Sequence, residues 1–260
     1  MSALSTFEVG ASHERTAPTA IRSKDLLGRV LVACEYSGIV RDAFTAAGWD
    51  AWSCDTLPSE RPGQHYQGDV RDILNEGWDL MIGHPPCTYL CNSGVRWLYN
   101  PDKTRNEPRW KSMEEGAKFF LALWNAPIPK IVLENPIMHK YAQRIIGVKW
   151  SQIIHPWQHG HECTKATCLW IKGELPALRP TKIVGRGTVY VDRRGIKHGS
   201  DFIMRAKVGY SPLMLLPKTS ERWKIRSRTF QGIGDAFANQ WTPATRPNEK
   251  LCREAGQKTL

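Results

Sequence analysis

The segment Arg29-Val-Leu-Val-Ala-Cys34 decides the fold, because a short continuous apolar run is typical of a strand buried in a parallel sheet. Glu35-Tyr-Ser-Gly38 follows it as a turn, and apolar residues then recur at helical spacing over 39–47 until Gly48 ends the helix. A second strand is predicted over Asp50–Asp55, with an acid at its end. These segments predict a strand–helix–strand unit.

The same alternation continues along the chain. Trp78–Gly83 predicts a strand that runs into His84-Pro-Pro-Cys87, and Lys111–Asn125 predicts an amphipathic helix. Lys130–Leu133 predicts another strand, followed by Glu134-Asn-Pro136. This order predicts an α/β fold with a mostly parallel sheet flanked by helices, in which ligands bind beyond the carboxyl ends of the strands. The residues expected there are Glu35, Ser37, Gly38, Asp55, Asp69, Cys87 and Glu134.

The net charge of +11 is concentrated in one segment. Arg179–Arg228 holds thirteen Lys and Arg against three Asp and Glu, whereas the other 210 residues hold 23 against 22. This segment is either a solvated face or a surface that contacts phosphates. Its interleaved aromatic residues fit base contact and hairpin packing equally well. The basic residues predicted to bind nucleic acid are Arg186, Arg193, Arg194, Lys197, Arg205 and Lys207.

Composition bounds the organisation of the chain. No run approaches the roughly 20 apolar residues of a membrane helix, residues 1–28 lack a signal-peptide core, and seven scattered cysteines fit a reducing compartment. We therefore expect a cytoplasmic protein with no membrane contact. We predict flexible tails at 1–26 and 246–260, and between them a catalytic and cofactor-binding domain at 27–178. A small basic β-rich insertion is predicted at 179–218, with a hairpin near Thr188–Ile196, and closing helices are predicted at 219–245.

The His84-Pro-Pro-Cys87 loop is the first candidate for chemistry. Two prolines stiffen the chain directly after a strand and fix the direction of Cys87, which is suited to a nucleophile if its thiolate is favoured. The alternative is a buried, inert thiol, the role expected of Cys91. Glu134 is the second candidate. Burial would raise its pKa and make it a hydrogen-bond donor, whereas the alternative is a solvated acid at a strand end.

Weaker signals precede these two. Gly38 opens a helix after a buried strand, where a ligand can approach the backbone, and Asp55 occupies the place of an acid that holds a ribose. Asp69 is placed to accept from an adenine amino group. Each of the two acids is equally consistent with a simple loop residue. The absence of Gly-x-Gly-x-x-Gly disfavours a dehydrogenase.

Together the motifs resemble those of the cytosine-5 DNA methyltransferases over about residues 29–241, and in particular the compact members of phage and prophage genomes. Val30–Phe44 is similar to the first motif, and Gly83–Cys87 is similar to the nucleophile loop with an extra proline. Glu134-Asn-Pro136 resembles Glu-Asn-Val. Lys165 stands where the family has an arginine motif. The segment that ends at Trp241 stands where the family has its closing motif, but its residues differ from that motif. Between these two places the family has a target-recognition domain, and here only the basic segment is present.

The resemblance implies a Rossmann-like class I fold dependent on S-adenosyl-L-methionine (SAM), with DNA as partner and no obligate protein partner. It implies a Cys87 thiolate that adds to carbon 6 of a flipped cytosine, and a Glu134 that stabilises ring nitrogen 3. The implied catalytic residues are Cys87, Glu134, Asn135 and Lys165. The implied cofactor-binding residues are Glu35, Tyr36, Ser37, Gly38, Asp55, Asp69, Pro85 and Pro86. The small basic segment predicts low sequence specificity.

Three other functions remain open from the sequence: an adenine or cytosine amino-methyltransferase, an enzyme that modifies free cytosine nucleotides, and a non-catalytic DNA-binding relative. An amino-methyltransferase needs an amide or carboxylate at the first position of the His84–Cys87 loop and an aromatic residue at the fourth. His84 and Cys87 occupy these positions and supply neither. We predict no metal site. Zinc remains an alternative because the chain also holds a loose cluster of His155, His159, His161, Cys163 and Cys168.

Overall fold

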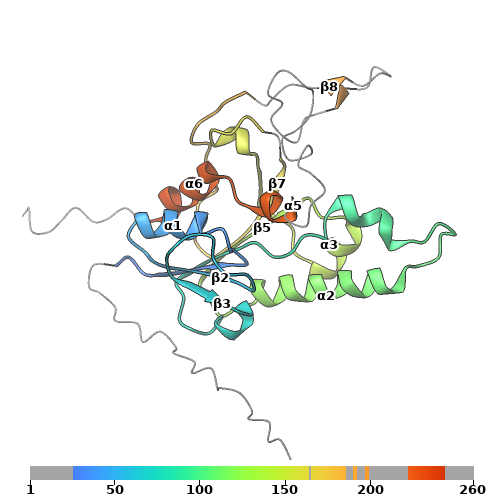
Figure 1. The fold of residues 1–260 in the computed structure, drawn as a ribbon, viewed down its shortest axis with the longest axis horizontal. Coiled ribbons are helices and arrows are strands. Elements are labelled where there is room, and N and C mark those ends of the chain that lie inside the picture. The colour runs from blue at the N-terminus through green and yellow to red at the C-terminus, as the bar shows by residue number, and fades with distance from the viewer. Residues whose placement is uncertain (1–25, 164, 186–189, 192–196, 199–221, 244–260) are drawn as a thin grey trace, which may run out of the picture.

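The computed structural model describes residues 26–163, 165–185, 190–191, 197–198 and 222–243. These residues form a mixed α/β structure around one seven-stranded sheet in the order β3-β2-β1-β4-β5-β7-β6 (Figure 1). The strands are β1 (Arg29–Ala33), β2 (Asp50–Asp55), β3 (His65–Gln67), β4 (Leu80–Gly83), β5 (Lys130–Pro136), β6 (Gln152–Ile154) and β7 (Thr167–Lys172). The pairs among β1 to β5 are parallel, and β7 pairs antiparallel with both β5 and β6.

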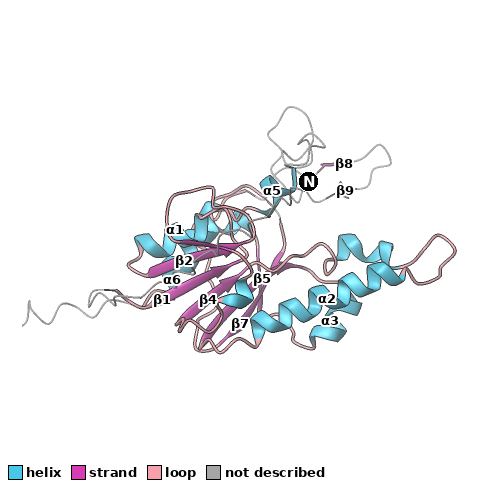
Figure 2. Ribbon diagram, turned by 60° about the horizontal axis from the view of Figure 1, so that its bottom comes forward, coloured by secondary structure: helices cyan, strands magenta, loops and turns pink. Residues whose placement is uncertain are grey.

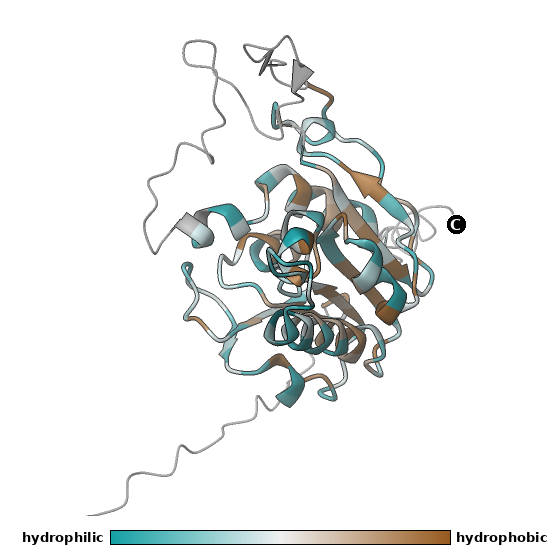
Figure 3. Cartoon of the chain, turned by 90° about the vertical axis from the view of Figure 1, so that its right-hand side faces the viewer, coloured by the Kyte–Doolittle hydropathy of each residue, from teal (hydrophilic) through white to brown (hydrophobic). Residues whose placement is uncertain are grey.

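Helices cover both faces of the sheet (Figure 2). One face packs against α2 (Glu107–Trp124) and α3 (Lys140–Ile146), and the other against α1 (Ile39–Ala46) and α6 (Gln231–Trp241). Alternate residues of β1 enter the two cores: Leu31 and Ala33 face α2, whereas Val30 and Val32 face α1. All five residues of β1 are buried, as expected of a central parallel strand. Figure 3 shows hydrophobic residues along the central strands.

The predicted strand–helix–strand core is confirmed, with β1, α1, β2 and β4 within two or three residues of their expected bounds. Two elements are longer than expected. α2 begins at Glu107, where the Asn106 side chain accepts from the Arg109 N–H and caps the helix. β5 continues through Glu134 to Pro136, because β7 pairs with it up to Thr167. The antiparallel strands β6 and β7 and the short α3 were not predicted.

The segment predicted as an insertion is described only in part. β8 (Tyr190–Val191) and β9 (Lys197–His198) pair antiparallel, which confirms the predicted hairpin for these four residues. The helix expected near residue 219 appears as α5 (Arg222–Ser227). None of the helices within the described ranges is long and apolar enough to cross a membrane.

Candidate active site

The direction of chain progression across the sheet reverses between β1 and β4. The chain runs outward from β1 to β2 and β3, then returns to place β4 on the other side of β1 and continues to β5. Loops that leave the carboxyl ends of β1 and β4 therefore diverge, and such a crevice is where open α/β sheets bind ligands. The Glu35–Gly38 turn and the His84–Cys87 loop are these two loops.

The His84–Cys87 loop is attached to both neighbouring strands. The His84 N–H donates to the carbonyl oxygen of Ala33 at 2.9 Å, which continues the parallel ladder with β1. On the other side, Asn135 Nδ2 donates to the carbonyl oxygen of Pro85 at 2.8 Å, and Asn135 is only 1% exposed. Asn135 thus fixes the loop that carries Cys87 rather than facing solvent.

Glu134 and His84 form a largely buried ion pair between the ends of β5 and β4. His84 Nδ1 lies 2.9 Å from Glu134 Oε2, and the two side chains are 11% and 18% exposed. Burial opposes the charge on both groups, but the hydrogen bond and the opposite charge outweigh it. The pKa of Glu134 is therefore lowered, with Lys165 and Thr167 contributing, and the pKa of His84 is raised. The expected rise in the pKa of Glu134 is wrong for this reason.

Cys87 and Cys91 share one helical turn, in which the Leu90 and Cys91 N–H groups donate to the Cys87 carbonyl oxygen. Their thiols interact with each other. This interaction and burial raise the pKa of Cys87, and the charge of Glu134 adds to the effect. The same interaction lowers the pKa of Cys91 to about 5, with help from the Ser93 hydroxyl, 3.0 Å from Cys91 Sγ, and from the N–H groups of Ser93 and Gly94. Cys91 is buried, as expected of an inert thiol, but its lowered pKa differs from that role.

Two buried polar atoms at this site have no hydrogen-bond partner among the described residues: His84 Nε2 and Asn135 Oδ1. Buried polar atoms of this kind are rare in folded proteins, and they mark places where a bound group completes the hydrogen bonding. Both atoms belong to the two motifs that the resemblance marks as catalytic. Two hydrogen-bonding atoms next to the Cys87 loop thus remain available to a polar group.

The turn after β1 is built mainly by its own backbone. Glu35 is 4% exposed, and its carboxylate accepts from the N–H groups of Val40 at 2.8 Å and Arg41 at 3.1 Å. Ser37 Oγ donates to the same carboxylate at 3.0 Å. Gly38 has φ +71°, a conformation that a side chain disfavours. Glu35 thus caps α1, and Ser37 is the residue of this turn that lines the neighbouring pocket.

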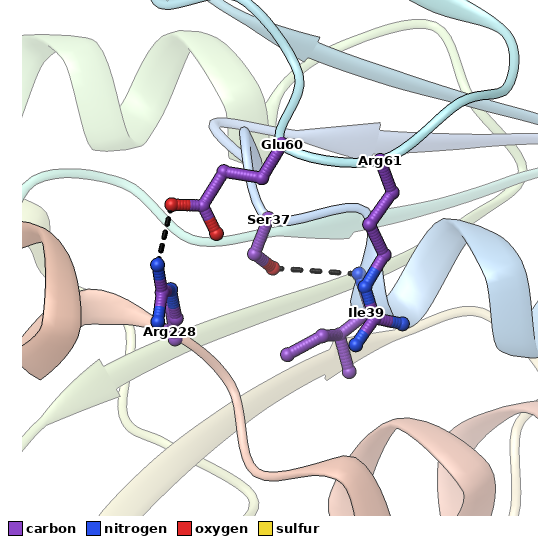
Figure 4. Close-up of a pocket in the computed structure, with 5 residues that line it drawn as sticks. All are labelled: Ser37, Ile39, Glu60, Arg61 and Arg228. Atoms are coloured by element: carbon purple, nitrogen blue, oxygen red, sulfur yellow. Dashed lines mark hydrogen bonds and ion pairs between the residues drawn. The ribbon is translucent and has the colours of Figure 1, made fainter.

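A pocket of about 520 Å³ opens beside this turn and is lined by Ser37, Ile39, Glu60, Arg61 and Arg228 (Figure 4). Arg228 Nη2 and Glu60 Oε1 form an ion pair at 2.6 Å across it. The volume falls in the range of about 300–1,000 Å³ that is usual for small-molecule sites. No sequence signal assigns Glu60, Arg61 and Arg228 to one pocket, because nothing local relates residues that are 168 positions apart.

Arg41 holds the loop that carries Glu60 and Arg61. Its side chain is 1% exposed, and its guanidinium donates to Ser59 Oγ at 3.0 Å and to the Pro62 carbonyl oxygen at 2.9 Å. On the side of the pocket that carries Arg228, Tyr36 holds α5 in place: its hydroxyl donates to the Lys224 carbonyl oxygen and lies 3.2 Å from Ser227 Oγ. The pocket walls are thereby tied to the sheet from both ends.

Asp55 and Asp69 end β2 and follow β3, as predicted, but they differ in availability. Asp55 Oδ1 accepts from the Leu57 N–H at 3.0 Å, and Oδ2 receives no hydrogen bond from the described residues. Both oxygens of Asp69 accept from Arg71, which holds the pKa of Asp69 below its usual range. Asp55 keeps a free oxygen for a ligand, whereas Asp69 would have to release Arg71.

The described structure thus brings together Cys87, Glu134, Asn135 and Pro85, with Pro86 exposed on the loop. Lys165 is half-buried nearby, and its charge lowers the pKa values of Glu134 and Cys87. Arg186, Arg193, Arg194, Arg205 and Lys207 lie outside the described residues, and Lys197 is described only as part of β9. Their predicted role stays a prediction.

The loose His and Cys cluster serves other contacts. His159 Nδ1 lies 3.1 Å from Thr181 Oγ1, and His161 Nε2 accepts from the Gly232 N–H at 3.0 Å. Burial lowers the pKa of both imidazoles. Cys168 lies in β7 opposite Asn135. Within the part of the chain that the structure describes, no three His, Cys, Asp or Glu side chains converge as metal ligands do.

Among the comparisons with known proteins, only those with solved structures give matches. No protein-family model and no curated protein matches the sequence. Among solved structures, a protein described as a "putative DNA modification methyltransferase", encoded within a prophage of Escherichia coli, is similar at 15% identity with a TM-score of 0.39. The match covers 60% of this chain, and the chain spans about half of that protein, 52% of its length.

Proposed function

We propose that this protein is a SAM-dependent DNA cytosine-5 methyltransferase. One observation carries the proposal: the Cys87 loop and the Glu134-Asn135 strand end, 47 residues apart in sequence, are joined by two direct hydrogen bonds at the crevice. These bonds place a thiol and an acid within electrostatic reach of each other. A thiol attacking carbon 6 and an acid at nitrogen 3 of one pyrimidine need such an arrangement.

The sheet supports the finer fold assignment that we propose, the Rossmann-like class I methyltransferase fold. Its first five strands follow the order 3-2-1-4-5 of doubly wound nucleotide-binding sheets. The antiparallel β7 then extends the sheet beyond β5. We also propose a cytoplasmic location, because the described cysteines are all free thiols.

The pocket beside the β1–α1 turn fits the cofactor that this proposal requires. Arg61 and Arg228 suit a carboxylate, and Glu60 suits an ammonium group, which are the charged ends of a methionine moiety. Asp55 Oδ2 remains available for a ribose hydroxyl. When bound, SAM supplies an electrophilic methyl group. Glu35 would act indirectly, by holding the turn, rather than by touching the cofactor.

Cys87 needs to lose its proton before it can attack, and the charges around it decide when it does so. The pKa of Cys91 is lowered and that of Cys87 is raised, so the Cys91 thiolate is too weak a base to take the Cys87 proton. The charge of Glu134 raises the pKa of Cys87 and that of Lys165 lowers it, so protonation of Glu134 favours release of the Cys87 proton to solvent, and the resulting thiolate forms a bond to carbon 6 of cytosine. The extrusion of the base from the duplex that this requires is part of the proposal.

Glu134 needs a proton before it can donate a hydrogen bond to ring nitrogen 3, because a carboxylate only accepts hydrogen bonds. His84 is 2.9 Å away and has a raised pKa, so we propose that it supplies that proton through Nδ1. A proton or hydrogen bond given to nitrogen 3 makes carbon 6 more electrophilic and stabilises the negative charge that develops on the ring. Asn135 positions the loop, and Lys165 adds a positive charge near the developing anion.

Incubation of DNA with the protein and SAM, followed by mass spectrometry of the nucleosides, tests this proposal. We expect 5-methyldeoxycytidine, formed at many short sequence contexts, because the basic segment is too small to read a long site. N4-methyldeoxycytidine or N6-methyldeoxyadenosine would instead identify an amino-methyltransferase. Methylation of free dCTP but not of DNA would identify a nucleotide-modifying enzyme.

A further inference from the structure

A second surface next to Cys87 combines exposed aromatic rings with positive charge. Three of the eight large hydrophobic side chains exposed among the described residues lie within eleven positions: Tyr89, Trp97 and Tyr99, which are 36%, 53% and 39% exposed. Scattered exposed hydrophobic residues are normal, but a local group of aromatic ones marks an interaction site. None of these residues contributes to the site described above.

Cations accompany these rings. The Arg109 guanidinium lies 4.3 Å from the Tyr89 ring centre, and Arg105 lies 4.2 Å from that of Trp110. Residues 88–111 and 137–150 together hold eight Lys and Arg against two Asp and Glu. The near-neutral balance outside Arg179–Arg228 therefore hides a local excess of positive charge on this part of the chain.

Three rings in this part of the molecule pack against one another rather than standing alone. Tyr99, Trp110 and Tyr141 contact one another, with ring centres 5.0 to 6.3 Å apart, so the starts of α2 and α3 meet here. The loop that precedes α2 projects from this end of the molecule (Figure 1). We define Tyr89, Tyr99, Arg105, Arg109, Trp110 and Tyr141 as the aromatic surface.

The aromatic surface begins at the nucleophile loop. Arg109 Nη2 donates to the carbonyl oxygen of Thr88 at 3.3 Å, and Thr88 directly follows Cys87. His139 directly precedes α3, and its Nε2 atom lies 3.0 Å from the carbonyl oxygen of Tyr89. A strand bound along these rings would therefore run directly up to the Cys87 crevice.

We propose that the aromatic surface binds single-stranded DNA, with unpaired bases stacking on Tyr89 and Tyr99 and phosphates meeting Arg105 and Arg109. Exposed rings with interspersed arginines bind a single strand in this way, because every unpaired base offers a flat face and every nucleotide a negative charge. Bases inside a duplex offer no free face to these rings. Because the surface carries an excess of positive charge, it attracts a polyanion such as DNA more strongly than a protein with few acidic residues.

The test measures binding of fluorescein-labelled oligo-dT of 20 nucleotides, and of the same strand in a duplex with oligo-dA, by fluorescence anisotropy without cofactor. The result is independent of methyl transfer, so the proposed function can fail while this inference holds, and the reverse. Tyr99→Ala and Tyr89→Ala should each weaken binding of the single strand about five-fold or more, the lower end for one lost base stack. Tyr99→Phe keeps the ring and should retain affinity.

Two matched controls separate the surface from general effects. Ile153→Ala removes a side chain of β6 that is as exposed as Tyr99 and should leave affinity unchanged. Arg105→Ala should reduce the slope of log affinity against log salt by about 0.7, the value for one phosphate contact to a single strand. Lys118→Ala, which removes an exposed charge from α2, should not.

Three outcomes would overturn the inference. The first is unchanged affinity for oligo-dT in Tyr99→Ala and Arg105→Ala, with melting temperatures that show both variants to be folded. The second is an equal loss for single strand and duplex. The third is a change of oligomeric state in the tyrosine variants without a change in DNA affinity, which would identify the surface as an interface between copies of the chain.

Discussion

Two glutamates stand at the carboxyl ends of parallel strands, one buried and one largely buried, and their partners differ. Glu35, after β1, is held by the Val40 and Arg41 N–H groups at the start of α1. Glu134, near the end of β5, is held by the His84 side chain, close to a thiol and to two polar atoms that have no partner among the described residues. The backbone fixes the first acid in place, whereas the second depends on a group that can exchange a proton. We infer that Glu35 supports the fold and Glu134 takes part in the reaction.

Removal of the Cys87 thiol gives the largest expected effect. Cys87→Ala should lower methyl transfer by at least about 1,000-fold, because it removes the proposed nucleophile. Binding of SAM, measured by calorimetry, should persist, since the pocket lies at the β1–α1 turn. Undiminished methylation by this variant would show that the Glu134 end of the crevice is not the reaction centre.

The two glutamates are compared directly by the same substitution at each. Glu134→Gln should lower turnover about 100-fold, because the amide cannot pass a proton to nitrogen 3. Glu35→Gln should instead lower the free energy of unfolding by about 1 kcal/mol, as the weakening of a helix cap does, with a smaller loss of turnover. Single-turnover methylation and denaturant unfolding measure the two quantities. An equal loss of turnover in both variants would remove the distinction between them.

The His84–Glu134 pair should also control stability in a defined pH range. Because folding raises the pKa of His84, this residue stabilises the folded protein fully at pH values below the ordinary histidine pKa. That stabilisation is lost as pH rises through the raised pKa of the folded protein. Because folding lowers the pKa of Glu134, this residue stabilises the folded protein fully at pH values above the ordinary glutamate pKa. That stabilisation is lost as pH falls through the lowered pKa of the folded protein. The pair therefore stabilises the fold most between these limits.

His84→Asn tests that range by leaving Glu134 buried without its partner. At pH 6 the variant should lose about 3 kcal/mol of unfolding free energy, equivalent to about 100-fold in the folding equilibrium. As pH falls through the lowered pKa of Glu134 and the carboxylate takes up a proton, the difference from the unmodified protein should shrink. Urea unfolding at pH 6 and at a series of lower pH values measures it. A loss that does not depend on pH would mean that His84 contributes by packing alone.

Cys91→Ala gives the smallest expected effect on the reaction. Without Cys91, the interaction that contributes most to the raised pKa of Cys87 is lost, while burial and the charge of Glu134 still raise it. Because a smaller rise leaves more thiolate at a given pH, the pH dependence of turnover should move to lower pH, with a change in turnover at pH 7 of less than about ten-fold. The pH dependence of turnover measures this. A profile unchanged from that of the unmodified protein would return Cys91 to the role of an inert thiol.

The sequence predicted those parts of the fold whose signal is local. The apolar run of β1, the helical spacing of α1 and the proline-stiffened loop before Cys87 each lie within a few residues, so each could be recognised without the rest of the chain. β7 escaped prediction because its place beside β5 depends on antiparallel pairing with a distant segment. At seven residues, α3 is too short to show periodicity.

The candidate site divides in the same way. Cys87 and Glu134 were recognised by residue type and motif. The pairing of Glu134 with His84, which reverses the expected pKa shift, spans 50 residues and becomes visible only when β4 and β5 lie side by side. The wall of the pocket brings Arg228 to Glu60 from the far end of the chain. Contacts between side chains on separate elements are set by packing, and no sequence pattern records them.

A covalent trap tests the proposed reaction most directly. The protein is incubated with SAM and a DNA duplex that contains 5-fluorodeoxycytidine, because fluorine at carbon 5 prevents the release of the thiol after methyl transfer. We predict a stable protein–DNA adduct, located at Cys87 by peptide mass spectrometry and missing in Cys87→Ala. Failure to form an adduct while SAM is consumed on unmodified DNA, or an adduct on a different residue, would contradict the assignment of Cys87 and Glu134 as the reacting pair.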